Sequence, residues 1–101
     1  MKVRWTPTAI GHLASIYEYI ARDSARYAQR MVDRITSRSR QIARFPRSGQ
    51  MVPEYQDPHI REVLEGQYRV IYEVAATETH VLAVIHGAQL LPPEPPREPG
   101  A

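Results

Sequence analysis

Apolar residues recur at intervals of three and four through the first half of the chain, as on one face of an α-helix. The first stripe comprises Ile10, Leu13, Ile16, Tyr17 and Ile20. Thr6 suits the N-cap of this helix, and Pro7 suits its first position, where a missing N–H costs no hydrogen bond. The stripe stops near Asp23. The pattern therefore predicts a helix of about four turns that begins after Thr6.

A second apolar stripe predicts another helix, with Ser24 as its N-cap. This stripe comprises Ala28, Met31, Val32, Ile35 and Ile42. The helix should end at Phe45, because a residue that precedes proline disfavours helical backbone angles. Since only a short connection separates the two stripes, the helices should form an antiparallel hairpin.

Four further segments have the composition and alternation of β-strands. They are residues 2–5, 60–64, 68–73 or 74, and 81–86. Short connections join the last three, so these strands should run antiparallel to one another. Simple alternation places Val81, Ala83 and Ile85 on one face of the last strand. Residues 47–58 contain one glycine and two prolines and are predicted to form a loop.

The predicted order is β-α-α-β-β-β, an α+β fold in which a helical hairpin packs on one face of a small antiparallel sheet. A chain of 101 residues suffices for one domain with a modest core. We assign this domain to residues 1–91. Residues 92–101 are rich in proline and lack periodicity, so they are predicted to form a flexible or extended tail.

Cysteine is absent, which excludes a disulfide and a thiolate metal site. No apolar stretch approaches the ~20 residues that a membrane-spanning helix needs. The N-terminus also lacks the continuous apolar core of a signal peptide. We therefore expect a soluble cytoplasmic protein that needs neither a metal nor a cofactor and does not associate with a membrane.

The net charge of +2 conceals two regions of opposite sign. Residues 24–47 contain seven arginines and one acid, for a local charge of +6. Residues 48–81 contain six acids and two arginines, for a local charge of −4. An uneven distribution of this kind suits a phosphate-bearing partner on the basic side. Arginine also outnumbers lysine twelve to one, which a GC-rich genome explains equally well.

Four of these arginines recur every fourth residue and should share a basic face of the second helix. They are Arg26, Arg30, Arg34 and Arg38. Only Asp33 offsets their charge within the helix.

Two more arginines lie in strands that look half buried, where an unpaired guanidinium is costly. We expect Arg61 and Arg69 to face a shallow groove on the side of the sheet away from the helices, open to a partner. The alternative is that Glu62 and Glu73 pair with them internally. His86, at the end of the last strand, either belongs to the same site or only bonds to nearby backbone.

In their order along the chain, several motifs resemble the RelE/ParE toxin superfamily of type II toxin–antitoxin modules. The motifs are Trp5, the pattern xPxAxxxLxxIxxYI of residues 6–20, Phe45-Pro46, Gly49, Val52-Pro53-Glu54, Ile60-Arg61-Glu62, Tyr68 to Tyr72 and Val84 to Ala88. The resemblance covers nearly all of the chain as far as Pro92. It implies the same order of elements. It also implies a cognate antitoxin protein that drapes over the toxin in a heterodimer or heterotetramer.

The superfamily offers two modes of action. RelE-like members cut mRNA on the ribosome without a metal, whereas ParE-like members bind DNA gyrase and stall it. The lysine-rich catalytic set of some RelE-like toxins does not match, because the only lysine is Lys2 and no tyrosine follows Tyr72.

A second catalytic set, of glutamate, arginine and histidine, does match the residue types present. Glu54 or Glu62 would take the 2′-OH proton, Arg61 and Arg69 would hold the phosphate, and His86 would protonate the leaving oxygen.

The low net charge argues against entry into a ribosomal RNA cleft, where phosphate contacts dominate affinity. The Trp5 opening and the segment 86–88 also look more ParE-like. We therefore predict a ParE-like gyrase inhibitor in which Arg61, Arg69 and His86 contact the target or the antitoxin. The alternative is a RelE-like, ribosome-dependent endoribonuclease.

Overall fold

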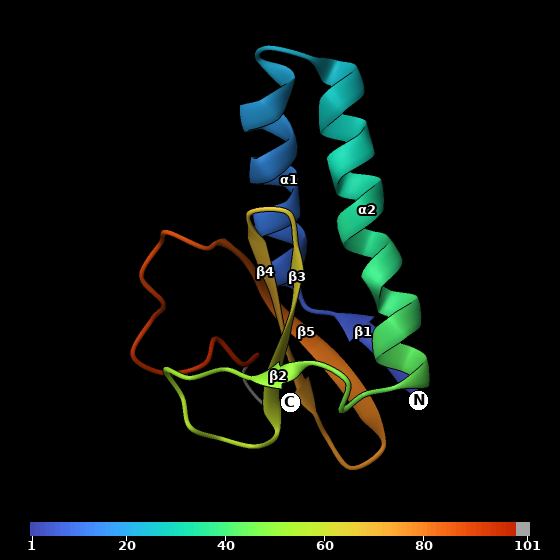
Figure 1. Ribbon diagram of the computed structural model, residues 1–101, viewed down its shortest axis with the longest axis vertical. Coiled ribbons are helices and arrows are strands. Elements are labelled where there is room, and N and C mark those ends of the chain that lie inside the picture. The colour runs from blue at the N-terminus through green and yellow to red at the C-terminus, as the bar shows by residue number, and fades with distance from the viewer. Residues whose placement is uncertain (99–101) are drawn as a thin grey trace.

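Two helices lie against one face of a five-stranded sheet in the computed structural model, which describes residues 1–98 (Figure 1). The helices are α1 (Pro7–Ala21) and α2 (Ala25–Arg44). The strands are β1 (Lys2–Trp5), β2 (Gln50–Met51), β3 (Ile60–Glu65), β4 (Tyr68–Val74) and β5 (Glu78–His86). The predicted order is confirmed, and the short β2 appears in addition within the segment expected to be a loop.

The strands are arranged in the order β1-β5-β4-β3-β2. Neighbours from β2 to β5 pair antiparallel, as the short connections require. The helical hairpin and the β3–β4–β5 meander then return the chain beside β1, which pairs with β5 in parallel. The sheet is therefore mixed, with β4 at its centre.

The predicted helix ends are confirmed by their hydrogen bonds. The Thr6 hydroxyl accepts from the Ala9 backbone N–H at 3.2 Å and donates to the Val81 carbonyl at 2.9 Å, which ties the start of α1 to β5. The Ser24 hydroxyl accepts from the Tyr27 N–H at 3.1 Å at the start of α2. These caps satisfy backbone donors that have no partner within their helices.

The sheet is apolar on both faces. The cluster beneath the helices comprises Ala9, Met31, Ile35, Ile42, Val63, Val70, Tyr72, Val74, Val81 and Val84. The cluster on the other face comprises Val52, Ile60, Ile71, Leu82, Ala83 and Ile85. Tyr55 and Leu91 pack against this second cluster, so the loop after β2 and the segment after β5 cover it.

An irregularity in β5 changes which residues share a face. Ile71 lies opposite Ala83 but Tyr72 lies opposite Val81, so Leu82 is an extra residue, a β-bulge. Val81 consequently faces the helices, whereas Ala83 faces away from them. The expectation that Val81 and Ala83 share a face is wrong, because a bulge interrupts strict alternation.

The proline-rich segment makes contacts with the domain as far as Glu98. The Tyr55 hydroxyl donates to the Pro92 carbonyl at 2.9 Å, and Arg97 pairs with Glu73 at 2.9 Å. The Glu98 carboxylate accepts from the Thr8 backbone N–H at 3.3 Å. The rest of the predicted flexible tail, residues 99–101, lies outside the described residues.

Within residues 1–98, neither helix has the length and apolar character needed to cross a membrane.

Candidate functional site

Arg69 forms a closed ion-pair cluster with Glu54 and Glu62 on the sheet face away from the helices. Its Nη1 and Nη2 donate to the two Glu54 carboxylate oxygens at 2.7 and 2.8 Å, a bidentate arrangement. Its Nε donates to Glu62 Oε1 at 2.5 Å. The Arg69 and Glu62 side chains are only 12% and 3% exposed, whereas that of Glu54 is 44% exposed.

The second Glu62 oxygen is also engaged, because the Gln50 amide donates to it at 3.0 Å. Arg69 is therefore neutralised inside the molecule. Glu62 is its partner, as the alternative interpretation had it. Glu73, the other candidate partner, instead pairs with Arg97.

This cluster favours the charged forms of Glu54 and Arg69. Hydrogen bonds from the Arg69 guanidinium lower the pKa of Glu54 from 4.5 to about 2. Hydrogen bonds to Glu54, and then to Glu62, raise the pKa of Arg69. A carboxylate with a pKa of about 2 has little tendency to take up a proton at neutral pH.

Arg61 lies on the opposite face of the sheet. It pairs across the strands with Tyr72, which faces the helices, whereas Arg69 pairs with Leu64 on the other face. The expectation that both arginines face away from the helices is therefore wrong for Arg61, because side chains alternate along β3.

Arg61 instead holds the loop that connects α2 to β3. Its Nε donates to the Pro58 carbonyl at 3.0 Å and its Nη1 donates to the Gly49 carbonyl at 2.9 Å. The Tyr72 hydroxyl accepts from the Gly49 N–H at 3.1 Å and donates to the Pro46 carbonyl at 2.7 Å. A Cβ on Gly49 would lie 2.5 Å from both the Glu62 carbonyl oxygen and this hydroxyl. Only glycine therefore fits at this position without displacing its neighbours.

His86 lies at the end of β5 on the helix-facing side, opposite Tyr68. The two rings meet edge to face with centroids 5.6 Å apart. His86 Nδ1 accepts from the Ala88 backbone N–H at 3.1 Å, so Nε2 carries the proton and donates to Gln67 Oε1 at 2.9 Å.

His86 also lines a hollow of about 480 Å³ between α1 and the ends of β4 and β5. The other lining residues are Ser15, Ile16, Tyr19, Gln67, Tyr68 and Gln89.

The five candidate catalytic residues do not converge. Glu54, Glu62 and Arg69 lie on the face away from the helices, whereas Arg61 and His86 lie on the helix-facing side. Even the latter two are far apart, because their partners on β4 are four residues from each other, about 13 Å along a strand. The sheet itself therefore separates the proposed acid from the proposed base.

The basic helix face is present for three of its four predicted members. Arg26, Arg30 and Arg34 are exposed. Arg38 turns towards the sheet, where its Nε lies 3.2 Å from Glu65 Oε1. Two exposed arginines that the spacing of four did not include, Arg40 and Arg44, lie on the same side of α2. Counting 100° per residue, instead of steps of four, would have found them.

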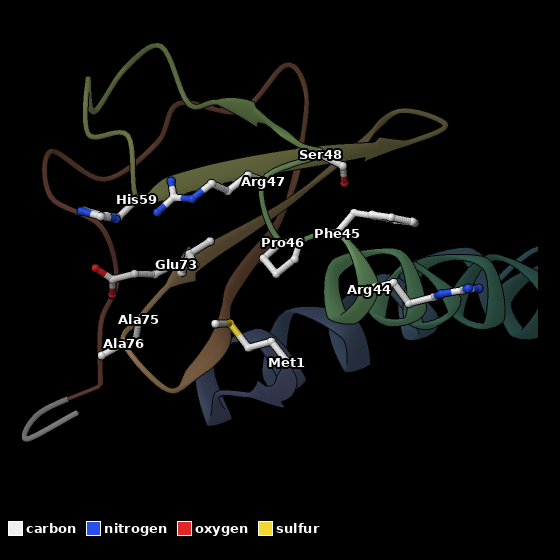
Figure 2. A pocket seen from close by; sticks show the side chains of 11 residues that line it. Met1, Arg44, Phe45, Pro46, Arg47, Ser48, His59, Glu73, Ala75 and Ala76 are labelled. Carbon is white, nitrogen blue, oxygen red and sulfur yellow. The ribbon is translucent and has the colours of Figure 1, made fainter.

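A shallow hollow of about 1030 Å³ lies where the end of α2 meets the end of β4 (Figure 2). Its walls come from the N-terminus, the α2–β2 connection, the start of β3 and the β4–β5 turn, and they include Met1, Phe45, Pro46 and Ala75. Arg44 and Arg47 border the hollow, and Phe45 is 60% exposed. Sequence analysis did not find this hollow, because its lining comes from four distant segments.

Among residues 1–98, no group of three or more histidine, aspartate or glutamate side chains is arranged to hold a metal ion.

Comparisons with known proteins agree with the resemblance. The family model for the ParE toxin of the type II toxin–antitoxin system parDE matches residues 3–91. Toxin RelE2 from Caulobacter vibrioides is 31% identical over 90 residues, which cover 88% of this chain and 98% of the relative.

Solved structures have the same fold. The chromosomal ParDE TA system from P. aeruginosa matches with a TM-score of 0.72 at 22% identity, over 85% of this chain and 95% of that one. The toxin–antitoxin complex RelBE2 from Mycobacterium tuberculosis matches with a TM-score of 0.59 at 21% identity, over 84% and 95% of the two chains.

Proposed function

The chain belongs to the ParE toxin family of type II toxin–antitoxin systems, and on this premise we propose that it stops growth by binding and inhibiting DNA gyrase. The observation that supports binding over RNA cleavage is the separation of the candidate catalytic groups onto the two faces of the sheet. Its site of action is then the cytoplasm, where the bacterial chromosome and gyrase lie.

Metal-free RNA cleavage needs a base, an acid and a cation within reach of one phosphate. Here Glu54 is held as a weak base by Arg69, and His86 lies across the sheet from both. The Arg69 donors are already bonded to Glu54 and Glu62. A binding function does not require these groups to meet, and it leaves the ion-pair cluster intact as part of the scaffold.

A cognate antitoxin is the second partner in this proposal, and the hollow beside His86 is its proposed contact site. Tyr19 on the rim is 68% exposed, and Ile16 and Tyr68 form apolar walls. Exposed aromatic residues around a concave surface are typical of protein interfaces. In this proposal Arg61 and Arg69 do not contact the partner directly. Arg61 holds the connection between α2 and β3, and Arg69 ties β4 to β3 and to the loop after β2.

A pulse-labelling experiment tests the choice of target. After induction of the chain, DNA synthesis should fall first and DNA cleaved in complex with gyrase should accumulate, while protein synthesis continues. Purified gyrase should lose supercoiling activity when the chain is added and regain it with the antitoxin. A fall in protein synthesis before any DNA damage would contradict gyrase inhibition.

The name of the 31% identical relative, Toxin RelE2, favours ribosome-dependent mRNA cleavage as a second candidate. That function requires His86 or Arg69 to act chemically, so His86→Ala would abolish toxicity while antitoxin binding survives. The gyrase proposal expects His86→Ala to weaken antitoxin binding through the lost Tyr68 contact and to leave the chain toxic.

The mass of the purified complex of the chain with its antitoxin distinguishes a heterodimer from a heterotetramer.

A further inference from the structure

Five arginines project from α2 on the side opposite its buried stripe. They are Arg26, Arg30, Arg34, Arg40 and Arg44, and we call them the arginine face. All five are exposed, and at 100° per residue they fall within an arc of about 120°. The buried residues Ala28, Met31, Ile35 and Ile42 occupy the opposite arc. The arginine face is therefore directed into solvent along the whole helix, which forms one outer edge of the molecule (Figure 1).

No member of the arginine face forms an ion pair with a carboxylate of residues 1–98. The one acid on this side of α2, Asp33, accepts a hydrogen bond from the Gln29 amide at 2.9 Å. Four of the seven arginines outside this face, Arg4, Arg38, Arg69 and Arg97, lie within 4 Å of a carboxylate. The positive charge of the arginine face is thus available to a partner.

We propose that the arginine face binds the phosphodiester backbone of duplex DNA. This inference rests on the proposed function, because duplex DNA is the substrate of gyrase. From Arg26 to Arg44 the helix rises about 27 Å, which matches about eight base pairs. Guanidinium groups are well suited to phosphate oxygens, and they carry most of the affinity of a backbone contact.

The residues between the arginines favour nucleic acid over a protein partner. Asp33, Ser37 and Gln41 lie within the same arc, and all three are polar. The centre of a protein interface normally buries apolar or aromatic side chains, and this face offers none.

The same residues favour a duplex over single-stranded RNA. Recognition of single strands uses aromatic side chains on which unpaired bases stack. The exposed Tyr27 and Phe45 lie only near the two ends of the arginine face, where the Phe45 ring centre is 5.9 Å from the Arg44 guanidinium. Within residues 26–44, no aromatic side chain lies between the arginines along the face. A helix face that carries five arginines suits the regular spacing of phosphates along a double helix.

The experiment measures binding of the purified full chain to a fluorescent duplex of about 24 base pairs, between about 50 and 200 mM salt. With five phosphate contacts, log K should fall with log salt with a slope of about −4.5. The double variant Arg30→Gln/Arg34→Gln should reduce the steepness by about 2 and weaken binding at 0.1 M salt on the order of 50-fold.

A matched control removes the same charge elsewhere. Lys2 and Arg4 lie on the face of β1 opposite Val3 and Trp5, which pack against the helix-side core. The variant Lys2→Gln/Arg4→Gln should therefore keep the slope of the unmodified chain. An equal loss in both variants would overturn the inference, because it would reduce the effect to net charge.

Two other outcomes would also overturn it. One is tighter binding to single-stranded RNA of the same length than to the duplex. The other is loss of antitoxin binding, with DNA binding unchanged, in Arg30→Gln/Arg34→Gln. DNA binding is measured without gyrase. The chain can therefore bind DNA without inhibiting gyrase, or inhibit gyrase without binding DNA, and the two experiments distinguish these outcomes. The two proposals therefore fail separately.

Discussion

Arg69 and Arg30 have the same side chain but opposite surroundings. Arg69 is 12% exposed and donates to two carboxylates, whereas Arg30 is exposed on the outer side of α2 without an ion pair in residues 1–98. The first arginine has become part of the scaffold, and the second remains available for binding. An arginine embedded in apolar sequence is thus the weaker indicator of function here, because burial forced it to acquire internal partners.

The largest effect is expected when the internal cluster loses its cation. Arg69→Ala leaves the Glu62 carboxylate, 3% exposed, without its charge partner, so the free energy of unfolding should fall by about 3–5 kcal/mol. Urea unfolding followed by circular dichroism measures this loss. The double variant Arg69→Leu/Glu62→Leu should lose much less. Equal losses in the single and double variants would show that Arg69 does not compensate a buried charge.

A smaller effect is expected at the loop that Arg61 and Tyr72 hold. Tyr72→Phe removes the hydroxyl that bridges the Pro46 carbonyl and the Gly49 N–H, and it leaves both groups without this partner. The free energy of unfolding should fall by about 1–2 kcal/mol. Arg61→Gln serves as a comparison, because it keeps the Tyr72 hydroxyl and removes only the Arg61 bonds to the loop. It should lower the free energy of unfolding by about 1 kcal/mol. Unchanged stability in Tyr72→Phe would mean that the loop is held by other contacts.

Glu54, the exposed carboxylate of the Arg69 cluster, should make the free energy of unfolding depend on pH. The pKa of Glu54 is lowered from 4.5 to about 2, so its stabilisation is complete above pH 4.5 and is lost as the pH falls towards 2. Because this carboxylate is 44% exposed, solvent screening reduces the effect to about 1 kcal/mol. Glu54→Gln should abolish this part of the acid dependence in unfolding experiments at several pH values. A variant with the original profile would contradict the assignment.

The smallest effect on folding is expected at the arginine face. Arg30→Gln/Arg34→Gln replaces two exposed side chains with another good helix former and relieves repulsion between like charges, so stability should change by less than about 0.5 kcal/mol. Thermal unfolding tests this, and it also shows that weaker DNA binding by the variant is not a folding defect. A loss of more than about 1 kcal/mol would place these arginines in the scaffold as well.

The helices were predictable because their signals are local. Each helix start is marked by a capping residue, Thr6 or Ser24, whose side chain bonds a backbone N–H three residues further on. The end of α2 is marked by the proline that follows Phe45. The short connections likewise defined the antiparallel meander. The parallel pairing of β1 with β5 was not predicted, because it joins residues more than seventy positions apart and no local pattern marks it.

The candidate site was less predictable, for the same reason. Arg69 is fifteen residues from Glu54, and only the folded loop brings their charges together. The face on which Arg61 lies depends on strand register, which its sequence neighbours do not specify. The extra residue Leu82 likewise moves Val81 to the helix side without any glycine or proline to mark the bulge.

The double cover of the sheet has a consequence for how the molecule opens. β4 is paired on both sides, and apolar clusters lie against both of its faces, around Val70 beneath the helices and around Ile71 beneath the loop and tail. Its backbone amides can reach water only when the whole domain comes apart. Deuterium should therefore enter β4 and the adjoining half of β5 last, long after it has labelled the ends of α1 and α2.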